Sequence, residues 1–318
     1  MKPEIVLMGA MMPHVMEALE AAYVVHRYAE AADKAAFLAE IKDGVRGMAT
    51  GGHHGDLDNG IIDALPKLEV ISSFGVGVDH IDIAHATGRG VIVTNTPDVL
   101  NDEVANLAIA LILMCSRQLV AADRFVRGGK WLEGGMPLQQ AIRGKTVGIL
   151  GLGRIGKDIA RKLQIFGCEV VYNGRREQAD QPYRYYADLA EMAGASDYLV
   201  VICPGGPETE GIVDRPVLDA LGPEGTLINV ARGSVVNEPE LVAALAEGRL
   251  GGAGLDVFAE EPQVPQALID LEQVVLLPHV GSATVQTRKA MGDLVVDNLA
   301  AHFAGKGALT PVDRKSVV

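Results

Sequence analysis

Three residues in the second half of the sequence, Arg232, Glu261 and His279, are of types that together could reduce a carbonyl group. They lie in the segments NVARGSVVNEPEL, GLDVFAEEP and LLPHVGSAT. Hydride delivery to a 2-keto acid creates an alkoxide that must be protonated, and histidine is the natural proton donor. A carboxylate partner would stabilise the imidazolium, and an arginine could hold the substrate carboxylate and polarise the keto oxygen. Each residue alone has an ordinary structural explanation, but their order downstream of a glycine motif favours catalysis.

That glycine motif is TVGILGLGRIGKDIARKL, which places Gly151, Gly153 and Gly156 in the spacing G-x-G-x-x-G. It follows a predicted strand and opens a predicted helix, as in dinucleotide-binding proteins. The first glycine permits a tight turn, the second lets the backbone approach a pyrophosphate, and the third lets the helix pack on the strand. The helix N-terminus then offers N–H groups and a positive dipole end to the phosphates. A chance glycine-rich turn is the less favoured alternative.

The stretch EVVYNGRREQ indicates which dinucleotide is bound. Asn173 occupies the position expected for a carboxylate that binds the ribose hydroxyls, and Arg175 and Arg176 follow it. A carboxylate would repel a 2′-phosphate, whereas the planar guanidinium group of arginine matches one. The sequence therefore predicts NADP(H) as the cofactor, with NAD(H) less favoured. The alternative interpretation is a solvated basic turn.

The overall composition is that of a globular protein. The 318 residues suffice for about two domains, with 48% hydrophobic and 22% charged residues. A net charge of −13 argues against partners that need a basic face, such as nucleic acid or an anionic membrane. The apolar run at 107–115 is too short to span a bilayer and no secretion signal is recognisable, so we expect a cytoplasmic protein. Three separated cysteines (Cys115, Cys168, Cys203) are expected to be reduced core thiols.

Apolar runs alternate with helical stretches along the chain, which predicts an α/β fold with parallel sheets. In the first part, strands are expected at 4–9, 68–75 and 90–97, and helices at 14–22, 34–41 and 59–67. One long helix is expected from Asn101 to about 129, with negative charge on its first turn. The final helical pattern, from 284 to 305, is expected to return to the first domain and make that domain discontinuous.

Together with GVGVDHIDI (75–83) and VTNTPDVLNDEVANLAIAL (93–111), these motifs closely resemble the D-isomer specific 2-hydroxyacid dehydrogenases over nearly the whole chain. Within that family, the arginine turn and GGKWLEGGMPL look most similar to glyoxylate/hydroxypyruvate reductases. The resemblance implies NADPH-dependent reduction of glyoxylate or hydroxypyruvate to glycolate or D-glycerate. It assigns His279 as the general acid, Glu261 as its partner and Arg232 as the residue that binds and activates the substrate.

The same resemblance implies two Rossmann-like domains, one flavodoxin-like and one NAD(P)-binding, with a cleft between them. The substrate-binding domain would comprise 1–100 and 286–318. The cofactor domain would comprise 101–285 and include a dimerisation arm at about 101–145, so a homodimer is expected.

Further site residues follow from the resemblance. Backbone N–H groups of Val76 and Gly77 would bind the substrate carboxylate. Leu100 and Trp131 would form an apolar wall near the substrate side chain, although the lone tryptophan could instead pack at a subunit interface. The remaining implied cofactor contacts are Arg154, Ile155, Cys203, Pro204, Thr209, Val230, Ala231, Asp256, His279, Gly281 and Ser282.

Two alternatives stay open: a dehydrogenase for another D-2-hydroxy acid, and a dinucleotide-sensing binding protein on the same fold, like the corepressor relatives. Formate dehydrogenase is disfavoured because that relative carries Gln where this chain has Glu261. Phosphoglycerate dehydrogenase with a regulatory extension is disfavoured because the chain ends soon after His279. His53 and His54 are adjacent but lack further ligands at a recognisable spacing, so no metal site is expected.

Overall fold

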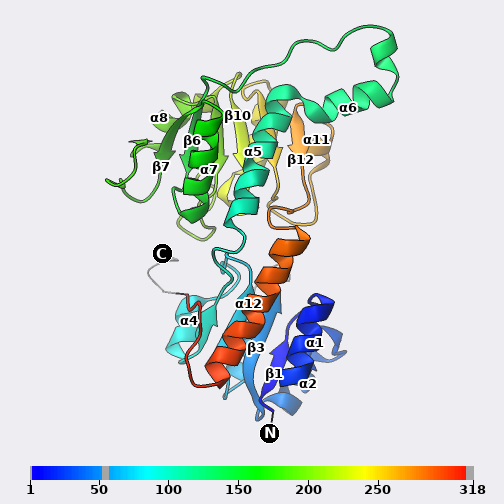
Figure 1. Cartoon of the computed structure of the whole chain (residues 1–318), viewed down its shortest axis with the longest axis vertical. Coiled ribbons are helices and arrows are strands. Elements are labelled where there is room, and N and C mark those ends of the chain that lie inside the picture. The colour runs from blue at the N-terminus through cyan, green and yellow to red at the C-terminus, as the bar shows by residue number, and fades with distance from the viewer. Residues whose placement is uncertain (1, 52–56, 313–318) are drawn as a thin grey trace. The chain divides into compact units, whose positions relative to one another are not determined.

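The computed structural model describes residues 2–51 and 57–312. The chain forms two compact units, one of Met1–Leu100 with Thr284–Val318 and the other of Asn101–Ala283. Each unit contains one sheet in which every strand pair is parallel (Figure 1). The predicted α/β class with two parallel sheets is therefore confirmed. After the second unit, the chain returns to the first between Ala283 and Thr284.

The first unit has a five-stranded sheet in the order β2-β1-β3-β4-β5, the order of flavodoxin-like sheets. Its strands are β1 (Glu4–Leu7), β2 (Val24–Arg27), β3 (Val45–Gly51), β4 (Val70–Phe74) and β5 (Ile92–Thr94). Its helices are α1 (Pro13–Ala22), the 3-10 turn η1 (Tyr28–Glu30), α2 (Lys34–Ile41), α3 (Asn59–Ala64), α4 (Ile83–Gly88) and α12 (Val285–Phe303).

The last helix of the chain, α12, completes the core of this first unit. Val295 and Leu299 are fully buried in one cluster with Ile5 and Leu19. The buried Ser72 hydroxyl donates to the backbone carbonyl of Val295 at 3.1 Å. The first domain is thus built from both ends of the chain, because α12 supplies the apolar surface that covers one face of its sheet (Figure 1).

The second unit has a seven-stranded sheet in the order β12-β11-β10-β9-β6-β7-β8. Its strands are β6 (Thr146–Leu150), β7 (Glu169–Asn173), β8 (Arg184–Tyr185), β9 (Tyr198–Val201), β10 (Thr226–Asn229), β11 (Gly252–Leu255) and β12 (Val274–Leu276). Its helical elements are α5 (Asn101–Arg117), α6 (Leu119–Arg127), η2 (Lys130–Leu132), α7 (Arg154–Ile165), α8 (Leu189–Gly194), α9 (Arg215–Leu221), η3 (Gly233–Val235), α10 (Glu238–Ala246) and α11 (Gln266–Ile269).

Helices cover both faces of this second sheet. Alternate strand residues, such as Leu199, Leu227 and Ala253, share a core with helices α8, α9 and α10. On the opposite face, α5 and α7 pack together, and α5 lies against Gly254 of β11. Strand β6 pairs with both β7 and β9, so the chain reverses its winding direction there. The carboxyl ends of the strands at such a switch point are where doubly wound sheets bind ligands.

The single long helix predicted from Asn101 to about 129 is wrong. It is two helices, α5 and α6, which meet at an angle of 59°. Gln118 between them has a φ of 45°, in the left-handed region, and this conformation cannot continue a right-handed helix. Asp102 and Glu103 do lie on the first turn of α5, as predicted.

Two strands of the first unit were not predicted. Strand β2 is short, lies at the sheet edge and contains no buried residue. Strand β3 is central and mostly buried, but its sequence VRGMATG includes two glycines, which are unfavourable in strands. Both strands lack the apolar alternation on which the sequence prediction depended.

Residues between Ser116 and Gln140 form an arm that leaves the second unit and returns to it. The arm contains α6 and η2, and the backbone N–H of Gln140 donates to the carbonyl of Ser116 at 3.1 Å, which closes its base. Large apolar side chains on it are exposed, including Trp131 at 68% and Leu138 at 100%. The arm projects from the body of this unit (Figure 1).

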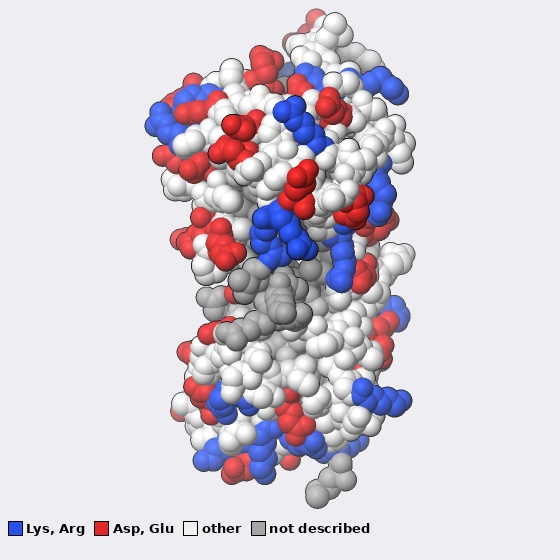
Figure 2. Space-filling model, turned by 90° about the vertical axis from the view of Figure 1, so that its left-hand side faces the viewer, with Lys and Arg blue, Asp and Glu red and all other residues white. Residues whose placement is uncertain are grey.

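Among the described helices, none alone has the length and hydropathy of a membrane span; only the bent pair α5 and α6 passes that test together. Acidic and basic side chains are interspersed over the face shown in Figure 2.

The three cysteines are free thiols, and burial raises the pKa of Cys115 to about 12 and that of Cys203 to about 11.

Candidate active site

Most of the predicted cofactor and catalytic residues of the second unit lie at one edge of its sheet. Gly151 follows β6, Asn173 ends β7, Cys203 follows β9, Arg232 follows β10 and His279 follows β12. Because all of these strands are parallel, their carboxyl ends meet at the same edge. The fold therefore gathers residues that are far apart in the sequence along one side of the unit.

The glycine loop after β6 is closely packed at Gly151 and Gly156 and open at Gly153. Gly151 has a φ of 104°, and a Cβ there would lie 2.7 Å from the backbone nitrogen of Cys203. A Cβ on Gly156 would lie 2.2 Å from the carbonyl oxygen of Gly151, so only glycine permits this approach of α7. A Cβ on Gly153 would meet nothing within 4 Å. The space beside Gly153 is thus open at the first turn of α7, where backbone N–H groups lack a side-chain cap.

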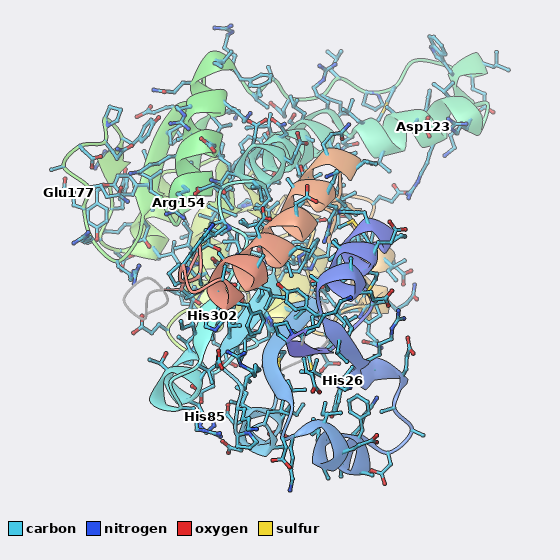
Figure 3. The ribbon with its side chains drawn as sticks, turned by 60° about the horizontal axis from the view of Figure 1, so that its bottom comes forward. His26, His85, Asp123, Arg154, Glu177 and His302 are labelled. Atoms are coloured by element: carbon cyan, nitrogen blue, oxygen red, sulfur yellow. The ribbon has the colours of Figure 1, made fainter. Side chains whose placement is uncertain are left out.

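The turn after β7 presents its arginines to solvent. Arg175 and Arg176 are exposed and make no ion pair with any residue that the structure describes. Asn173 is buried, and its side-chain amide donates to the carbonyls of Tyr186 and Ala187 at 2.9 and 3.2 Å. Figure 3 shows Glu177 on this turn and Arg154 at the start of α7, both in the second unit. The basic turn therefore has side chains that could contact a 2′-phosphate.

The loop after β9 contains three of the expected cofactor contacts. Cys203 is buried under the glycine loop, whereas Pro204 is exposed. The Thr209 hydroxyl donates to the carbonyl of Pro204 at 2.7 Å, which folds the loop back on itself.

The loop after β10 is held by Asn229, a residue that the sequence analysis did not single out. Its side-chain nitrogen donates to the carbonyl of Arg232 at 2.9 Å, and its side-chain oxygen accepts from the N–H of Ala231 at 3.0 Å. Val230 and Ala231 are buried, while Arg232 is partly exposed. Asn229 thereby fixes the backbone that carries Arg232. The only sequence signal was a polar residue at the end of an apolar strand.

Glu261 and His279 lie in direct contact. Nδ1 of His279 is 2.7 Å from Oε2 of Glu261, and both side chains are partly exposed, at 28% and 31%. The other carboxylate oxygen of Glu261 accepts a hydrogen bond from the backbone N–H of Phe258 at 3.1 Å. The backbone at His279 has a φ of 52°, in the left-handed region. A non-glycine residue in this region is uncommon and tends to occur at functional sites.

Asp256 holds the His279 loop in this conformation. Its carboxylate accepts from the backbone N–H groups of Val280 and Gly281, at 2.7 and 2.8 Å, and its carbonyl accepts from that of His279 at 2.8 Å. Burial raises the pKa of the Asp256 carboxyl, and the two N–H groups oppose that shift. Ser282, the next expected contact, is partly exposed.

In the first unit, Val76 and Gly77 lie in the loop after β4. Thr96 binds Gly75 twice, because its hydroxyl accepts from the Gly75 N–H and its own N–H donates to the Gly75 carbonyl. The Asn95 side chain donates to the Val76 carbonyl at 2.8 Å. Within the described part of the chain, the N–H groups of Val76 and Gly77 donate to no acceptor. Two adjacent unpaired donors on a fixed loop suit a carboxylate.

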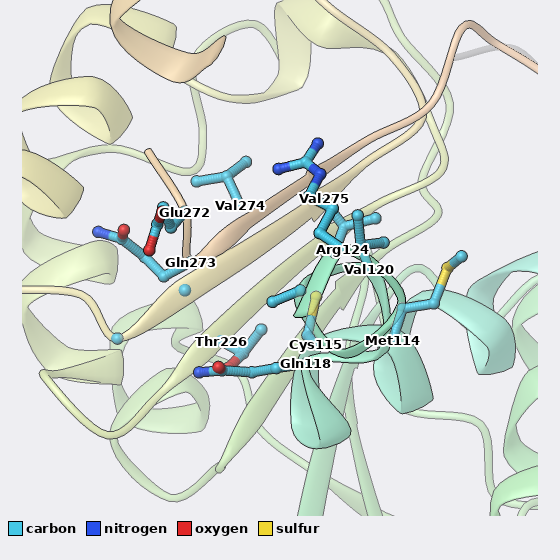
Figure 4. Close-up of a pocket in the computed structure, with 13 residues that line it drawn as sticks. Met114, Cys115, Gln118, Val120, Arg124, Thr226, Glu272, Gln273, Val274 and Val275 are labelled. Carbon is cyan, nitrogen blue, oxygen red and sulfur yellow. The ribbon is translucent and has the colours of Figure 1, made fainter. Parts of the chain in front are cut away.

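Leu100 and Trp131 differ in environment. Leu100 is buried in the first unit, whereas Trp131 is exposed on the arm of the second. A pocket (Figure 4) is lined by Cys115 and Gln118, at the start of the arm, and by the amino ends of β10, β11 and β12. The arm therefore leaves the second unit at the amino edge of its sheet. Within one chain, Trp131 is therefore not brought to the carboxyl edge where Arg232 and His279 lie.

The pocket of Figure 4 contains none of the predicted site residues. Among residues 2–51 and 57–312, no group of three or more His, Cys, Asp or Glu side chains could hold a metal ion. His53 and His54 lie outside the described residues.

Comparison with known proteins identifies the class. A family model described as the NAD binding domain of D-isomer specific 2-hydroxyacid dehydrogenases matches residues 109–281. The chain belongs to this family, which confirms the resemblance found in the sequence. It is 50% identical to a hydroxyphenylpyruvate reductase of Plectranthus scutellarioides, over 97% of this chain and 98% of the relative. It is 49% identical to the glyoxylate/hydroxypyruvate reductase A HPR2 of Arabidopsis thaliana, over the same shares.

Among solved structures, the chain is similar to an NADPH-dependent glyoxylate/hydroxypyruvate reductase of Sinorhizobium meliloti in complex with NADP and malonate. The two are 48% identical with a TM-score of 0.93, over 98% of this chain and 97% of the other.

Proposed function

We propose that this protein is an NADPH-dependent reductase that converts small 2-keto acids, such as glyoxylate and hydroxypyruvate, into 2-hydroxy acids. The observation that carries the proposal is the 2.7 Å contact between His279 and Glu261. It provides a proton donor with a fixed partner at the sheet edge that also carries Arg232 and the glycine loop. A dinucleotide sensor would need the loop but not this pair.

Each residue has a distinct role in the proposed reaction. The cofactor supplies the hydride. The N–H groups of Val76 and Gly77 bind the substrate carboxylate, and Arg232 polarises the keto oxygen as negative charge develops on it. Before the transfer, Glu261 stabilises the imidazolium form of His279 through Nδ1. His279 then donates its Nε2 proton to that oxygen and is left as a neutral imidazole.

The open first turn of α7 supports the binding of a dinucleotide. The exposed Arg175 and Arg176 support NADP(H) over NAD(H). The nicotinamide end would lie near Cys203, Pro204, Val230, Ala231, Asp256 and Ser282, which surround the same edge. The relatives support both the reduction of 2-keto acids and the use of NADP(H). The Sinorhizobium meliloti glyoxylate/hydroxypyruvate reductase is NADPH-dependent, and its structure holds NADP.

The two units and the arm also have distinct roles in the proposed enzyme. The first unit (residues 1–100 with the last helix) binds the substrate and the second binds the cofactor. The arm, with its exposed Trp131 and Leu138, joins a second copy of the chain in a homodimer. In such a dimer, Trp131 would line the substrate site of the other chain, beside Leu100 of that chain. It would not line the site of its own chain. The partners are small anionic acids, not nucleic acid or membrane, and the location is cytoplasmic.

The decisive test is the initial rate of NADPH and NADH oxidation with glyoxylate, hydroxypyruvate, hydroxyphenylpyruvate and pyruvate in parallel. We expect turnover with NADPH that depends on the keto acid and is much slower with NADH. Equal rates with NADH would refute the cofactor preference. Tight NADPH binding without turnover on any acid would favour the sensor.

A further inference from the structure

The turn that carries Arg175 and Arg176 is attached to the glycine loop through a residue outside the predicted site, Gln178. The side-chain nitrogen of Gln178 donates to the backbone carbonyl of Leu152 at 2.9 Å. Leu152 lies between Gly151 and Gly153 in the pyrophosphate loop. One carboxamide thus joins the two segments that would contact the two phosphate sites of an NADP molecule.

The backbone of Gln178 is fixed as well. Its N–H donates to the hydroxyl of Tyr172 at 2.7 Å. Tyr172 belongs to β7 and is only 1% exposed, so its hydroxyl would lack this partner if the turn moved away. The ring of Tyr172 lies 5.3 Å from that of Tyr185 in β8, and the Tyr185 hydroxyl donates to the carbonyl of Gly174 at 3.2 Å.

These contacts hold the basic turn at both ends. The first end is the pairing of β7 and β6, where Asn173 is opposite Leu150. The second end is Gln178, with hydrogen bonds from its backbone and its side chain. Only four residues, from Gly174 to Glu177, lie between the two ends. A short loop held in this way loses little conformational entropy when its side chains bind a ligand.

We propose that Gln178, supported by Tyr172, is a positioning residue for cofactor selectivity. It keeps the arginine turn at a fixed place relative to the pyrophosphate loop, so that a 2′-phosphate meets both guanidinium groups while the diphosphate occupies the loop. Gln178 acts through Arg175, Arg176 and Leu152, not by contact with the cofactor. This role rests on the proposed NADP(H) preference and explains how two solvated arginines could discriminate against NAD(H).

The test compares two adenosine ligands that need no turnover, 2′,5′-ADP and 5′-ADP, with binding measured by calorimetry. In Gln178→Met, a side chain of similar length replaces the carboxamide donor. Loss of one hydrogen bond should weaken 2′,5′-ADP binding about five- to tenfold, with less than a twofold change for 5′-ADP. Tyr172→Phe, which removes the other anchor, should act in the same direction. In the intact enzyme, Gln178→Met should raise the KM for NADPH without lowering kcat.

Gln181→Met is the matched control. Gln181 lies three positions later in the same loop, and its side chain bonds to the exposed Asp180 instead of the glycine loop. It should leave both affinities unchanged. Equal weakening of 2′,5′-ADP and 5′-ADP by Gln178→Met, or no weakening of either, would overturn the positioning role. Melting temperatures identify variants that lose affinity through unfolding.

The outcomes also separate this inference from the function on which it rests. If replacing Arg175 and Arg176 by alanine leaves 2′,5′-ADP affinity unchanged, the proposed NADP(H) preference fails, and the role of Gln178 fails with it. If the arginine variants weaken binding but Gln178→Met does not, only the role of Gln178 fails. Absence of keto-acid reduction in the wild type would affect neither binding result.

Discussion

Both carboxylate oxygens of Glu261 are engaged, one by Nδ1 of His279 at 2.7 Å and the other by the backbone N–H of Phe258 at 3.1 Å. The carboxylate therefore cannot rotate without losing one of these contacts. Because Glu261 is an acceptor fixed beside Nδ1, it favours the neutral tautomer of His279 that has its proton on Nδ1. In the imidazolium form, the proton on Nε2 is then the one available for transfer to the substrate. The pair thus orients the histidine as well as stabilising its charge.

Glu261→Gln should lower kcat about ten- to a hundredfold and leave NADPH affinity unchanged. The amide has only one oxygen, so it can accept from Phe258 or from His279 but not from both. Steady-state kinetics and NADPH titration would measure the two effects. Glu260→Gln, at the exposed neighbouring position, is the control and should behave as the wild type. Unchanged kcat in Glu261→Gln would exclude an essential role for the pair.

His279→Asn should lower kcat by a factor of about 10² to 10⁴, the usual contribution of general acid catalysis. Asparagine is chosen because it tolerates the left-handed backbone found at His279, whereas alanine would add strain. NADPH should still bind, as measured by fluorescence titration. A variant that retained full keto-acid turnover would show that the proton comes from elsewhere.

Alanine at Gly153 and at Gly156 should have opposite effects on folding and binding. At Gly156 the new Cβ would lie 2.2 Å from the Gly151 carbonyl oxygen, so the melting temperature should fall by several degrees. At Gly153 the Cβ meets no protein atom within 4 Å, so stability should be unchanged. NADPH affinity should nevertheless fall in Gly153→Ala, because the methyl group occupies the space proposed for the pyrophosphate. Unaltered affinity would place the phosphates elsewhere.

Asp256→Asn should lower kcat about a hundredfold through a small displacement of His279. An asparagine side chain can accept only one of the two N–H bonds from Val280 and Gly281, because its nitrogen is a donor. Kinetics, cofactor affinity and melting temperature should be measured together. Normal kcat in a stable variant would mean that the loop keeps its shape without the carboxylate.

Stability of the first unit should fall on acidification through Glu69. Arg46 forms two hydrogen bonds to this carboxylate, and together with His302 it holds the pKa of Glu69 below its ordinary value. A lowered folded-state pKa adds stability above about pH 4.3, the unfolded value, and this stability is lost as the pH falls through the folded pKa.

Glu69→Gln should therefore be less stable than the wild type at pH 7, and the difference should shrink towards pH 3. Urea unfolding at several pH values would measure it. A difference that is the same at every pH would assign the effect to packing and not to charge. Glu40→Gln, an exposed carboxylate on α2, is a suitable control.

Strong local signals made much of the architecture predictable. The glycine motif predicted the positions of β6 and α7, because only glycine fits at Gly151 and Gly156. The helix KAAFLAEI was predicted at its observed bounds, 34–41. By contrast, the break at Gln118 could not be foreseen, because glutamine is a good helix former and only the surrounding structure imposes its left-handed backbone.

The same limit applies to the site. Arg232, Glu261 and His279 belong to recognisable segments, but Thr96 and Gln178 act through long-range hydrogen bonds to backbone groups. Such bonds depend on how the strands assemble, and a single polar residue at a strand end or in a turn gives no sign of its partner. Trp131 shows the converse: the family resemblance suggested a role at the substrate, but its position depends on the course of the arm.

Because α12 completes the core of the first unit, the order of synthesis affects how the protein folds. The strands of that unit are synthesised before the second unit, yet the helix that covers Ile5 and Leu19 is synthesised after it. The second unit is continuous from Asn101 to Ala283 and can close before α12 appears. Until then the early strands present an uncovered apolar face, which is the kind of surface that chaperones bind and that aggregates if release is slow.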